Sequence, residues 1–119
     1  MLIKISDLVS QIKHKVNLIS ASQAVIKCRA LSGVIVDVRE PGEVNEKAAT
    51  GTVNIPRGVL EMRMLMLYPD PNQAIFIHCA SGVRAIFCAE QLNRLGYQNV
   101  WAMTCAIDDV CRAFEDKTN

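Results

Sequence analysis

The sequence predicts an α/β domain with a mostly parallel central sheet. Short apolar runs of strand length alternate along the chain with longer segments of helical periodicity, the order expected of successive βαβ units. Two runs, at 34–38 and 74–78, are almost continuously apolar, as expected of parallel strands that helices cover on both faces. The carboxyl ends of such strands lie along one edge of the sheet, where folds of this kind bind ligands.

Each remaining element rests on a local signal. A helix is expected over 6–14 at the start of the chain. Ser20 and Gln23 have the S-x-x-Q spacing of a capping box, which opens a helix that ends at about Leu31. Pro41 suits the first turn of a short helix, and Gly96 stands where a helix usually ends. The other predicted elements are strands at 52–55 and 99–103 and helices at 58–67, 85–95 and 106–114.

Length and charge limit the kinds of function. A chain of 119 residues, 50% of them hydrophobic, can form one domain with a substantial core. The formal net charge is only +1 and no block of like charge stands out, which argues against nucleic acid or a membrane as a partner. The first residues lack the apolar core of a signal peptide, and no apolar run approaches the roughly 20 residues of a membrane span. We therefore expect a cytoplasmic protein.

The cysteine pattern argues against zinc-ribbon and thioredoxin-type sites. Five cysteines are an odd number, and no two of them have C-x-x-C spacing. In a reducing compartment most of them are expected to be small core residues. Cys88 is the clearest case, because it shares one helical stripe with Ala85, Ala89 and Leu92.

Cys79 is the candidate nucleophile. It follows the predicted strand at 74–78 and precedes a helix, so its sulfur faces the unpaired N–H groups and the positive dipole end of that helix. Such a setting favours the thiolate over the thiol. Gly82 lets several N–H groups of the loop converge on one point, and Arg84 adds a permanent charge. The loop at 79–84 is therefore expected to hold a nucleophilic thiolate in an anion-binding cradle.

Three segments, in this order, resemble the rhodanese domain. The first is Val-Asp-Val-Arg-Glu-Pro-Gly-Glu at 36–43, and the second is Thr-Gly-Thr-Val-Asn-Ile-Pro-Arg-Gly at 50–58. The third is the C-x-x-G-x-R loop at 79–84, followed by Leu-Gly-Tyr-Gln-Asn-Val at 95–100. The resemblance runs from Leu18 to Phe114 and leaves out only the predicted opening helix.

The resemblance implies a fold, an activity and a domain division. The fold is a rhodanese-like three-layer α/β/α arrangement with a mostly parallel central sheet, in which a helical extension at 1–17 packs on a rhodanese domain at 18–119. The activity is that of a sulfurtransferase, in which Cys79 takes a sulfane sulfur from thiosulfate or a persulfide donor. The Cys79 persulfide then passes the sulfur to a thiophilic acceptor, namely cyanide, a thiol or a protein cysteine, with ping-pong kinetics.

The same resemblance assigns roles within the loop. Backbone N–H groups there are expected to bind the substrate and stabilise the persulfide, much as an oxyanion hole does. The substrate-binding residues would be Ala80, Ser81, Gly82, Val83 and Arg84. No metal and no organic cofactor is needed. A partner-dependent sulfur carrier and a non-catalytic binding module of the rhodanese type are the alternatives.

The chain departs from the family pattern at two places. Many members carry Arg or Lys directly after the cysteine, whereas this chain has Ala80 and Ser81, so we expect thiosulfate to be a poorer donor than a persulfide. The family's Gly-Gly pair after the last strand is replaced by Thr-Cys-Ala-Ile at 104–107, which brings Cys105 towards the active edge. Arg57 and Cys105 are therefore candidates for the pocket rim, although a solvated arginine and a core cysteine are the simpler interpretations.

A cysteine phosphatase is the rival enzyme, since some phosphatases share this fold. Their loop has the form C-x5-R, whereas only four residues separate Cys79 from Arg84, and this contraction favours a single sulfur atom over a tetrahedral phosphate. His78 is expected to be a packed residue rather than a base, because neighbouring residues of a strand point to opposite faces.

Three further features have structural interpretations. Asp37 and Arg39 are expected to form an ion pair. Ser81 is expected either to contact the bound sulfur or to cap the following helix. The leucines and methionines at 60–67 are expected to be core, with a docking surface as the alternative.

Overall fold

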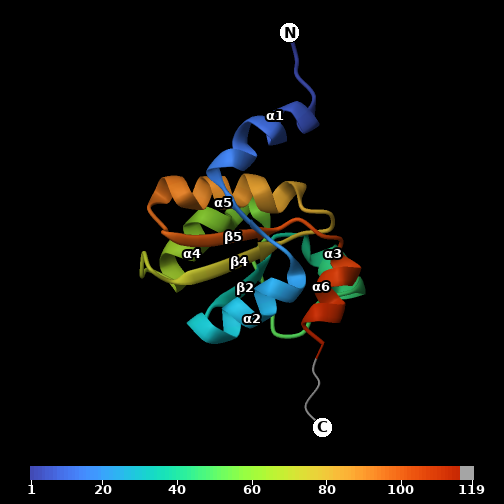
Figure 1. The fold of residues 1–119 in the computed structure, drawn as a ribbon, viewed down its shortest axis with the longest axis vertical. Helices are drawn as coiled ribbons and strands as arrows, with labels where there is room; N and C mark the ends of the chain where they lie inside the picture. Colours follow the sequence, from blue (N-terminus) through green and yellow to red (C-terminus); the bar gives the residue numbers. More distant parts are fainter. Residues whose placement is uncertain (116–119) are drawn as a thin grey trace.

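The computed structural model describes residues 1–115 and contains a five-stranded sheet in which every pairing is parallel. The strand order is β1-β5-β4-β2-β3, so the central strand β4 carries Cys79 just beyond its carboxyl end (Figure 1). The predicted α/β class with a mostly parallel sheet is confirmed. The strands are β1 (Asn17–Ile19), β2 (Val34–Asp37), β3 (Val53–Asn54), β4 (Ala74–His78) and β5 (Asn99–Met103).

Helices cover both faces of the sheet and give three layers (Figure 1). Helices α1, α4 and α5 lie on one face, and α2 and α6 lie on the other. None of the helices in residues 1–115 is both long and apolar enough to cross a bilayer. The α-helices are α1 (Ile5–Ile12), α2 (Ala21–Leu31), α3 (Pro41–Glu46), α4 (Leu60–Leu67), α5 (Val83–Leu95) and α6 (Ile107–Ala113), with 3-10 turns η1 (Lys13–Lys15) and η2 (Arg57–Val59).

Strand alternation divides the core into two clusters. Val36, Ile75 and Ile77 face α4 and α5, whereas Ile35 and Phe76 face α2 and α6. We call these the first and the second cluster. In the second cluster the ring of Phe76 stacks on that of Trp101 with a centroid separation of 4.9 Å. A Cβ at Gly33 would lie 2.7 Å from Cε2 of Phe76, so this glycine makes room for the ring.

The predicted helix signals act as expected. The backbone N–H of Gln23 donates to Oγ of Ser20, which caps α2, at 3.2 Å. Pro41 occupies the first turn of α3. Gly96 ends α5 with φ of 110°, in the left-handed region that only glycine adopts easily.

The amino-terminal segment contains a strand that its sequence does not predict. Helix α1 packs on the first cluster through Val9 and Ile12, but residues 17–19 form the edge strand β1 beside β5. The sheet therefore begins at Asn17, inside the stretch expected to be a helical extension. The predicted division into 1–17 and 18–119 stays a prediction.

Helix α4 exposes most of its apolar side chains. Only Leu60 and Met64, one turn apart, are buried in the first cluster. The exposed side chains are Met62 at 67%, Leu65 at 51%, Met66 at 78% and Leu67 at 52%. The core interpretation is wrong for these four, because a helix of eight residues contacts α5 along a single stripe.

Candidate active site

The sulfur of Cys79 is buried at the amino terminus of α5. The residue is 1% exposed, and its Sγ accepts the backbone N–H of Gly82 at 3.0 Å and that of Ala85 at 3.4 Å. Both donors belong to the cap or first turn of α5, so the positive end of the helix dipole also points at Sγ. The geometry therefore favours negative charge on this sulfur.

Gly82 is required for two reasons. Its φ is 103°, which strains any residue with a side chain. A Cβ there would also lie 2.8 Å from Cα of Thr104. The same connection between β5 and α6 fixes the other side of the loop, because the N–H of Ile107 donates to the carbonyl of Ala80 at 2.9 Å. The loop at 79–84 thus packs against the segment that follows β5.

Arg84 forms a two-pronged ion pair with Glu43 of α3. Nη1 lies 2.8 Å from Oε2 and Nη2 lies 2.9 Å from Oε1, with the two side chains 31% and 38% exposed. The guanidinium, with help from the N–H of Glu40, lowers the pKa of Glu43 to about 2. Glu43 belongs to the segment at 36–43 that resembles the family, but the sequence alone does not indicate its contact with Arg84. Glu43 stands three residues after the N-cap Glu40, which is the spacing of a capping box, and this spacing is the sequence signal that its side chain caps α3.

Asp37 and Arg39 form the predicted ion pair, fully inside the protein. Nη2 of Arg39 lies 2.8 Å from Oδ2 of Asp37, and the side chains are 4% and 0% exposed. The guanidinium also donates to the carbonyl of Lys47 at 2.6 Å. The amide of Asn54 donates to the carbonyls of Asp37 and Arg39, both at 2.9 Å. This network holds the carboxyl end of β2 to the end of α3 and to β3.

His78 lies beside this network, on the opposite face from Cys79. It pairs in register with Asp37, and its Nε2 is 3.8 Å from Oδ2 of that carboxylate. Cys79 instead packs in the first cluster with residues of α5. Neither ring nitrogen of His78 has a hydrogen-bond partner among residues 1–115. Burial lowers the pKa of His78, an effect that the charge of Asp37 opposes.

The stability of the protein is expected to fall between about pH 7 and pH 5 because of His78. An unfolded histidine titrates near pH 6.5, and the folded pKa is lower, so the unfolded chain binds more protons in this window. Urea unfolding at several pH values checks this. The other histidine, His14, is exposed, so a His78→Gln variant is expected to lose the slope. An unchanged slope in that variant would contradict the assignment.

Arg57 and Cys105, the two candidates for the pocket rim, lie in different parts of the molecule. The guanidinium of Arg57 lies 4.9 Å from the centroid of Phe87, above a cavity of about 230 Å³ that Cys88 also lines. Cys105 is half-buried against the second cluster, whereas Cys79 is in the first. Burial raises the pKa of Cys88 to about 12, in keeping with a core residue.

Two other expectations concern Ser81 and metals. Ser81 is exposed, and α5 has Gly82 as its N-cap with no side-chain capping bond, so the capping interpretation of Ser81 is wrong. Within residues 1–115 no group of three or more His, Cys, Asp or Glu side chains could hold a metal ion.

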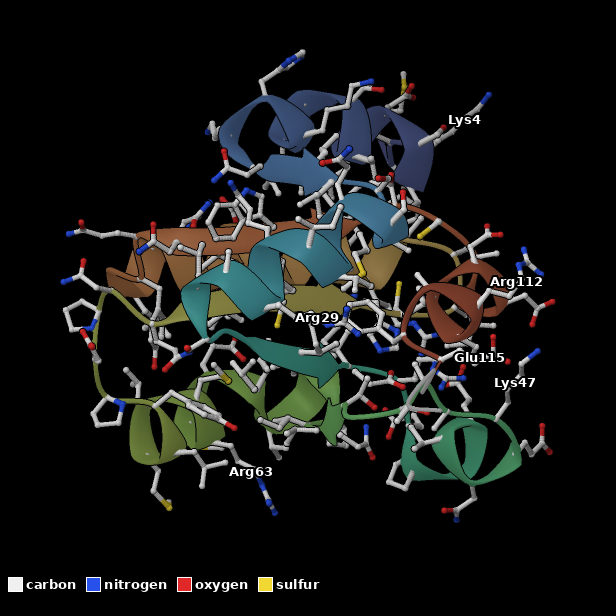
Figure 2. All side chains as sticks on the ribbon, turned by 60° about the horizontal axis from the view of Figure 1, so that its bottom comes forward. Lys4, Arg29, Lys47, Arg63, Arg112 and Glu115 are labelled. Carbon is white, nitrogen blue, oxygen red and sulfur yellow. The ribbon has the colours of Figure 1, made fainter. Side chains whose placement is uncertain are left out.

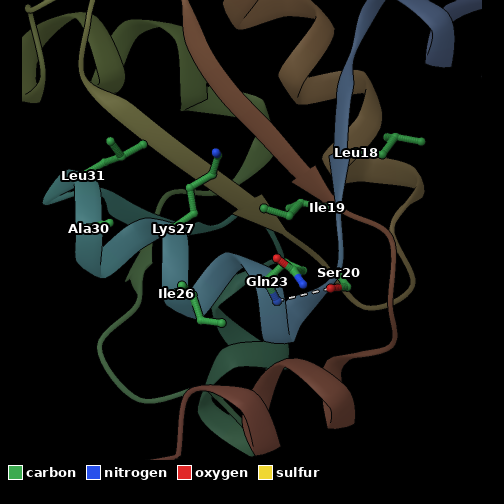
Figure 3. A pocket seen from close by; sticks show the side chains of 8 residues that line it. All are labelled: Leu18, Ile19, Ser20, Gln23, Ile26, Lys27, Ala30 and Leu31. Carbon is green, nitrogen blue, oxygen red and sulfur yellow. Dashed lines mark hydrogen bonds between the residues drawn. The ribbon is translucent and has the colours of Figure 1, made fainter.

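A large cavity lies away from the Cys79 loop. It has a volume of about 510 Å³ and runs between the edge strand β1 and helix α2 (Figure 3). Ile19, Ile26 and Leu31 line it together with Lys27. None of the residues at 79–84 borders this groove.

Two thiosulfate sulfurtransferases are similar to this chain. The thiosulfate sulfurtransferase PspE of Escherichia coli is 29% identical over 65 residues, which are 55% of this chain and 62% of that protein. The chain thus spans about six-tenths of the length of this curated relative. A thiosulfate sulfurtransferase structure from Pseudomonas aeruginosa superposes with a TM-score of 0.69 at 24% identity, over 86% of this chain and 20% of that one.

At 24% identity the Pseudomonas aeruginosa structure shows the fold alone, and so does a second solved structure. A Rhodopseudomonas palustris protein of unknown function, described as a possible tyrosine phosphatase, superposes with a TM-score of 0.70 at 21% identity, over 94% of this chain and 91% of that one. The family model for the rhodanese-like domain matches residues 20–113, most of the chain. With the parallel sheet and the loop at 79–84, this match shows that the chain belongs to the rhodanese-like domain family.

Proposed function

We propose that this protein is a sulfurtransferase that carries a sulfane sulfur on Cys79. The observation that carries the proposal is the pair of backbone N–H groups, from Gly82 and Ala85, that point at a buried Sγ where α5 begins. Membership of the rhodanese-like family and similarity to a thiosulfate sulfurtransferase support it.

The reaction would occur in two displacements with no net change in oxidation state. The Cys79 thiolate attacks the outer sulfur of the donor, the donor's S–S bond breaks, and the leaving group keeps the electron pair. Sulfite leaves from thiosulfate, and a thiolate leaves from an alkyl persulfide. An acceptor thiolate or cyanide then attacks the outer sulfur of Cys79–S–S⁻ and restores the Cys79 thiolate.

The loop would stabilise both anionic states of Cys79. In the resting enzyme the amides of Gly82 and Ala85 hold the thiolate. In the persulfide the charge moves outward by one sulfur atom, to which the remaining N–H groups between Ala80 and Arg84 would donate. The four residues between Cys79 and Arg84 suit one sulfur atom rather than the tetrahedral phosphate of a C-x5-R loop.

Intact-mass analysis tests the proposal. Reduced protein is incubated separately with thiosulfate and with a low-molecular-weight persulfide. We expect a gain of one sulfur atom that cyanide removes, present in a Cys105→Ala control and absent from Cys79→Ala. A stable adduct in Cys79→Ala, or no adduct from either donor, would contradict the proposal.

One observation favours the carrier form of this activity. The side chains of Met62, Leu65, Met66 and Leu67 form an exposed apolar stretch on α4. A protein acceptor could use such a stretch, whereas cyanide could not. Fast loading of Cys79 with slow transfer to small acceptors would support a carrier, and fast transfer to cyanide would support a small-molecule enzyme.

A further inference from the structure

The positive charge of Arg84 is paired with a carboxylate. Both terminal nitrogens of its guanidinium are bound to the two oxygens of Glu43, at 2.8 and 2.9 Å. A guanidinium in such a fork presents its donors to one carboxylate and has its charge balanced by it. The cation expected to attract substrate anions is therefore already paired.

Glu43 is fixed in place from its own side of the pair. It occupies the third position of α3, and its Oε2 accepts the N–H of Glu40 at 2.9 Å within a capping box. The carbonyl of Glu43 also accepts Nη1 of the buried Arg39 at 3.5 Å. Glu43 stays ionised at every working pH, since its pKa is about 2. Its negative charge is thus a permanent part of the site.

Several other cations among residues 1–115 are likewise paired with a carboxylate or stacked on a ring. Arg39 is buried against Asp37, and Arg57 lies over Phe87 in a cavity that also contains Glu61. Ala80 and Ser81 carry no charge. Lys47 is paired with Asp108 and Arg112 with Asp109. Figure 2 shows Arg29 on α2 and Arg63 on α4.

We propose that Glu43 determines donor specificity. By holding Arg84 in a two-pronged pair, it leaves backbone dipoles as the main attraction for an anion at Cys79. The site then accepts the single charge of an alkyl persulfide and discriminates against the double charge of thiosulfate. The substrate class rests on the proposed function, but the charge effect itself does not.

Charge-selective alkylation measures this effect without any sulfur transfer. Iodoacetate is an anion and iodoacetamide is neutral, and both react with the thiolate, so the ratio of their rates at Cys79 cancels changes in nucleophilicity. The ratio is read by mass spectrometry of the peptide that contains Cys79, since the other cysteines also react. We expect Glu43→Gln to raise the iodoacetate-to-iodoacetamide ratio roughly tenfold at low salt and less at high salt.

Matched variants separate charge from structure. Glu46→Gln removes an exposed carboxylate from the same helix without touching Arg84, and it is expected to leave the ratio unchanged. Arg84→Gln leaves Glu43 alone and is expected to lower the ratio. The double variant Glu43→Gln/Arg84→Gln is expected to return it to the wild-type value. An equal ratio in wild type, folded Glu43→Gln and folded Arg84→Gln would overturn the proposal.

Donor kinetics extend the test to the substrate class. In Glu43→Gln we expect KM for thiosulfate to fall roughly tenfold, with kcat and the persulfide KM little changed. A role confined to supporting the loop would instead lower kcat for both donors. If Cys79 takes sulfur from neither donor, the proposed function fails, and the alkylation ratio still decides the charge effect. A shifted alkylation ratio with an unchanged thiosulfate KM would overturn the specificity claim.

Discussion

Replacing Asp37 by asparagine is expected to lower the free energy of unfolding by about 3–5 kcal/mol. The amide has nearly the shape of the carboxylate but cannot balance the charge of Arg39, which is only 4% exposed and cannot turn to water. The remaining partners of the guanidinium are carbonyl oxygens, of which Lys47 O at 2.6 Å is the nearest. Urea unfolding at neutral pH measures the change.

Two comparisons test the reason given for this loss. Asp108→Asn breaks the exposed Lys47–Asp108 pair at the meeting of α3 and α6, and it is expected to change stability little because solvent screens that pair. Asp37→Leu/Arg39→Met removes both buried charges and is expected to be more stable than Asp37→Asn. If the double variant is the less stable one, the loss comes from packing and backbone contacts rather than from an unpaired charge.

Replacing Gly82 by alanine is expected to slow the loading of Cys79 by about 10²–10³-fold, the effect of losing one oxyanion-hole donor. The new methyl group would lie 2.8 Å from Cα of Thr104, so the loop must move. That movement withdraws the Gly82 N–H, now 3.0 Å from Sγ. Single-turnover sulfur transfer, followed by mass, gives the rate. Stability is expected to fall as well, by about 1–2 kcal/mol for the strained φ.

Gly96 provides the control for this substitution. Its φ is 110°, close to the 103° of Gly82, but a Cβ there meets no atom within 4 Å. Gly96→Ala therefore carries the same backbone strain at the far end of α5, and it is expected to load Cys79 at the wild-type rate. Equal rates in Gly82→Ala and Gly96→Ala would show that contact with Thr104 does not set the position of the donor.

The central strand of the sheet and the Cys79 loop could be predicted because both depend on short stretches of sequence. The strand at 74–78, the loop at 79–84 and the following helix are contiguous, so periodicity and one glycine define them. The partner of Arg84 could not be predicted in this way. Glu43 is 41 residues distant in sequence, and only the parallel packing of the strands brings α3 to the start of α5.

The errors at β1 and at α4 have a similar cause. Strand β1 has three residues, two of them exposed, so its sequence has little apolar pattern to detect. The apolar residues of α4 predicted a buried helix, yet burial depends on how many neighbours a helix has. Helix α4 packs on α5, and its residues Leu60 and Met64 enter the first cluster. Composition alone does not report the number of neighbours.

The order of the strands also has a consequence for how the chain folds. Within the part of the chain that the structure describes, strand β1 pairs with β5 alone. The side chain of Asn17 donates to the carbonyl of Val100, 83 residues further along the chain. During synthesis β1 is therefore made long before β5, and it stays unpaired until nearly the whole domain has been made. Closing such a long loop is slow, and an unpaired strand invites pairing with other chains. We therefore expect the sheet to close only after translation of β5, with β1 as the segment most dependent on chaperones until then.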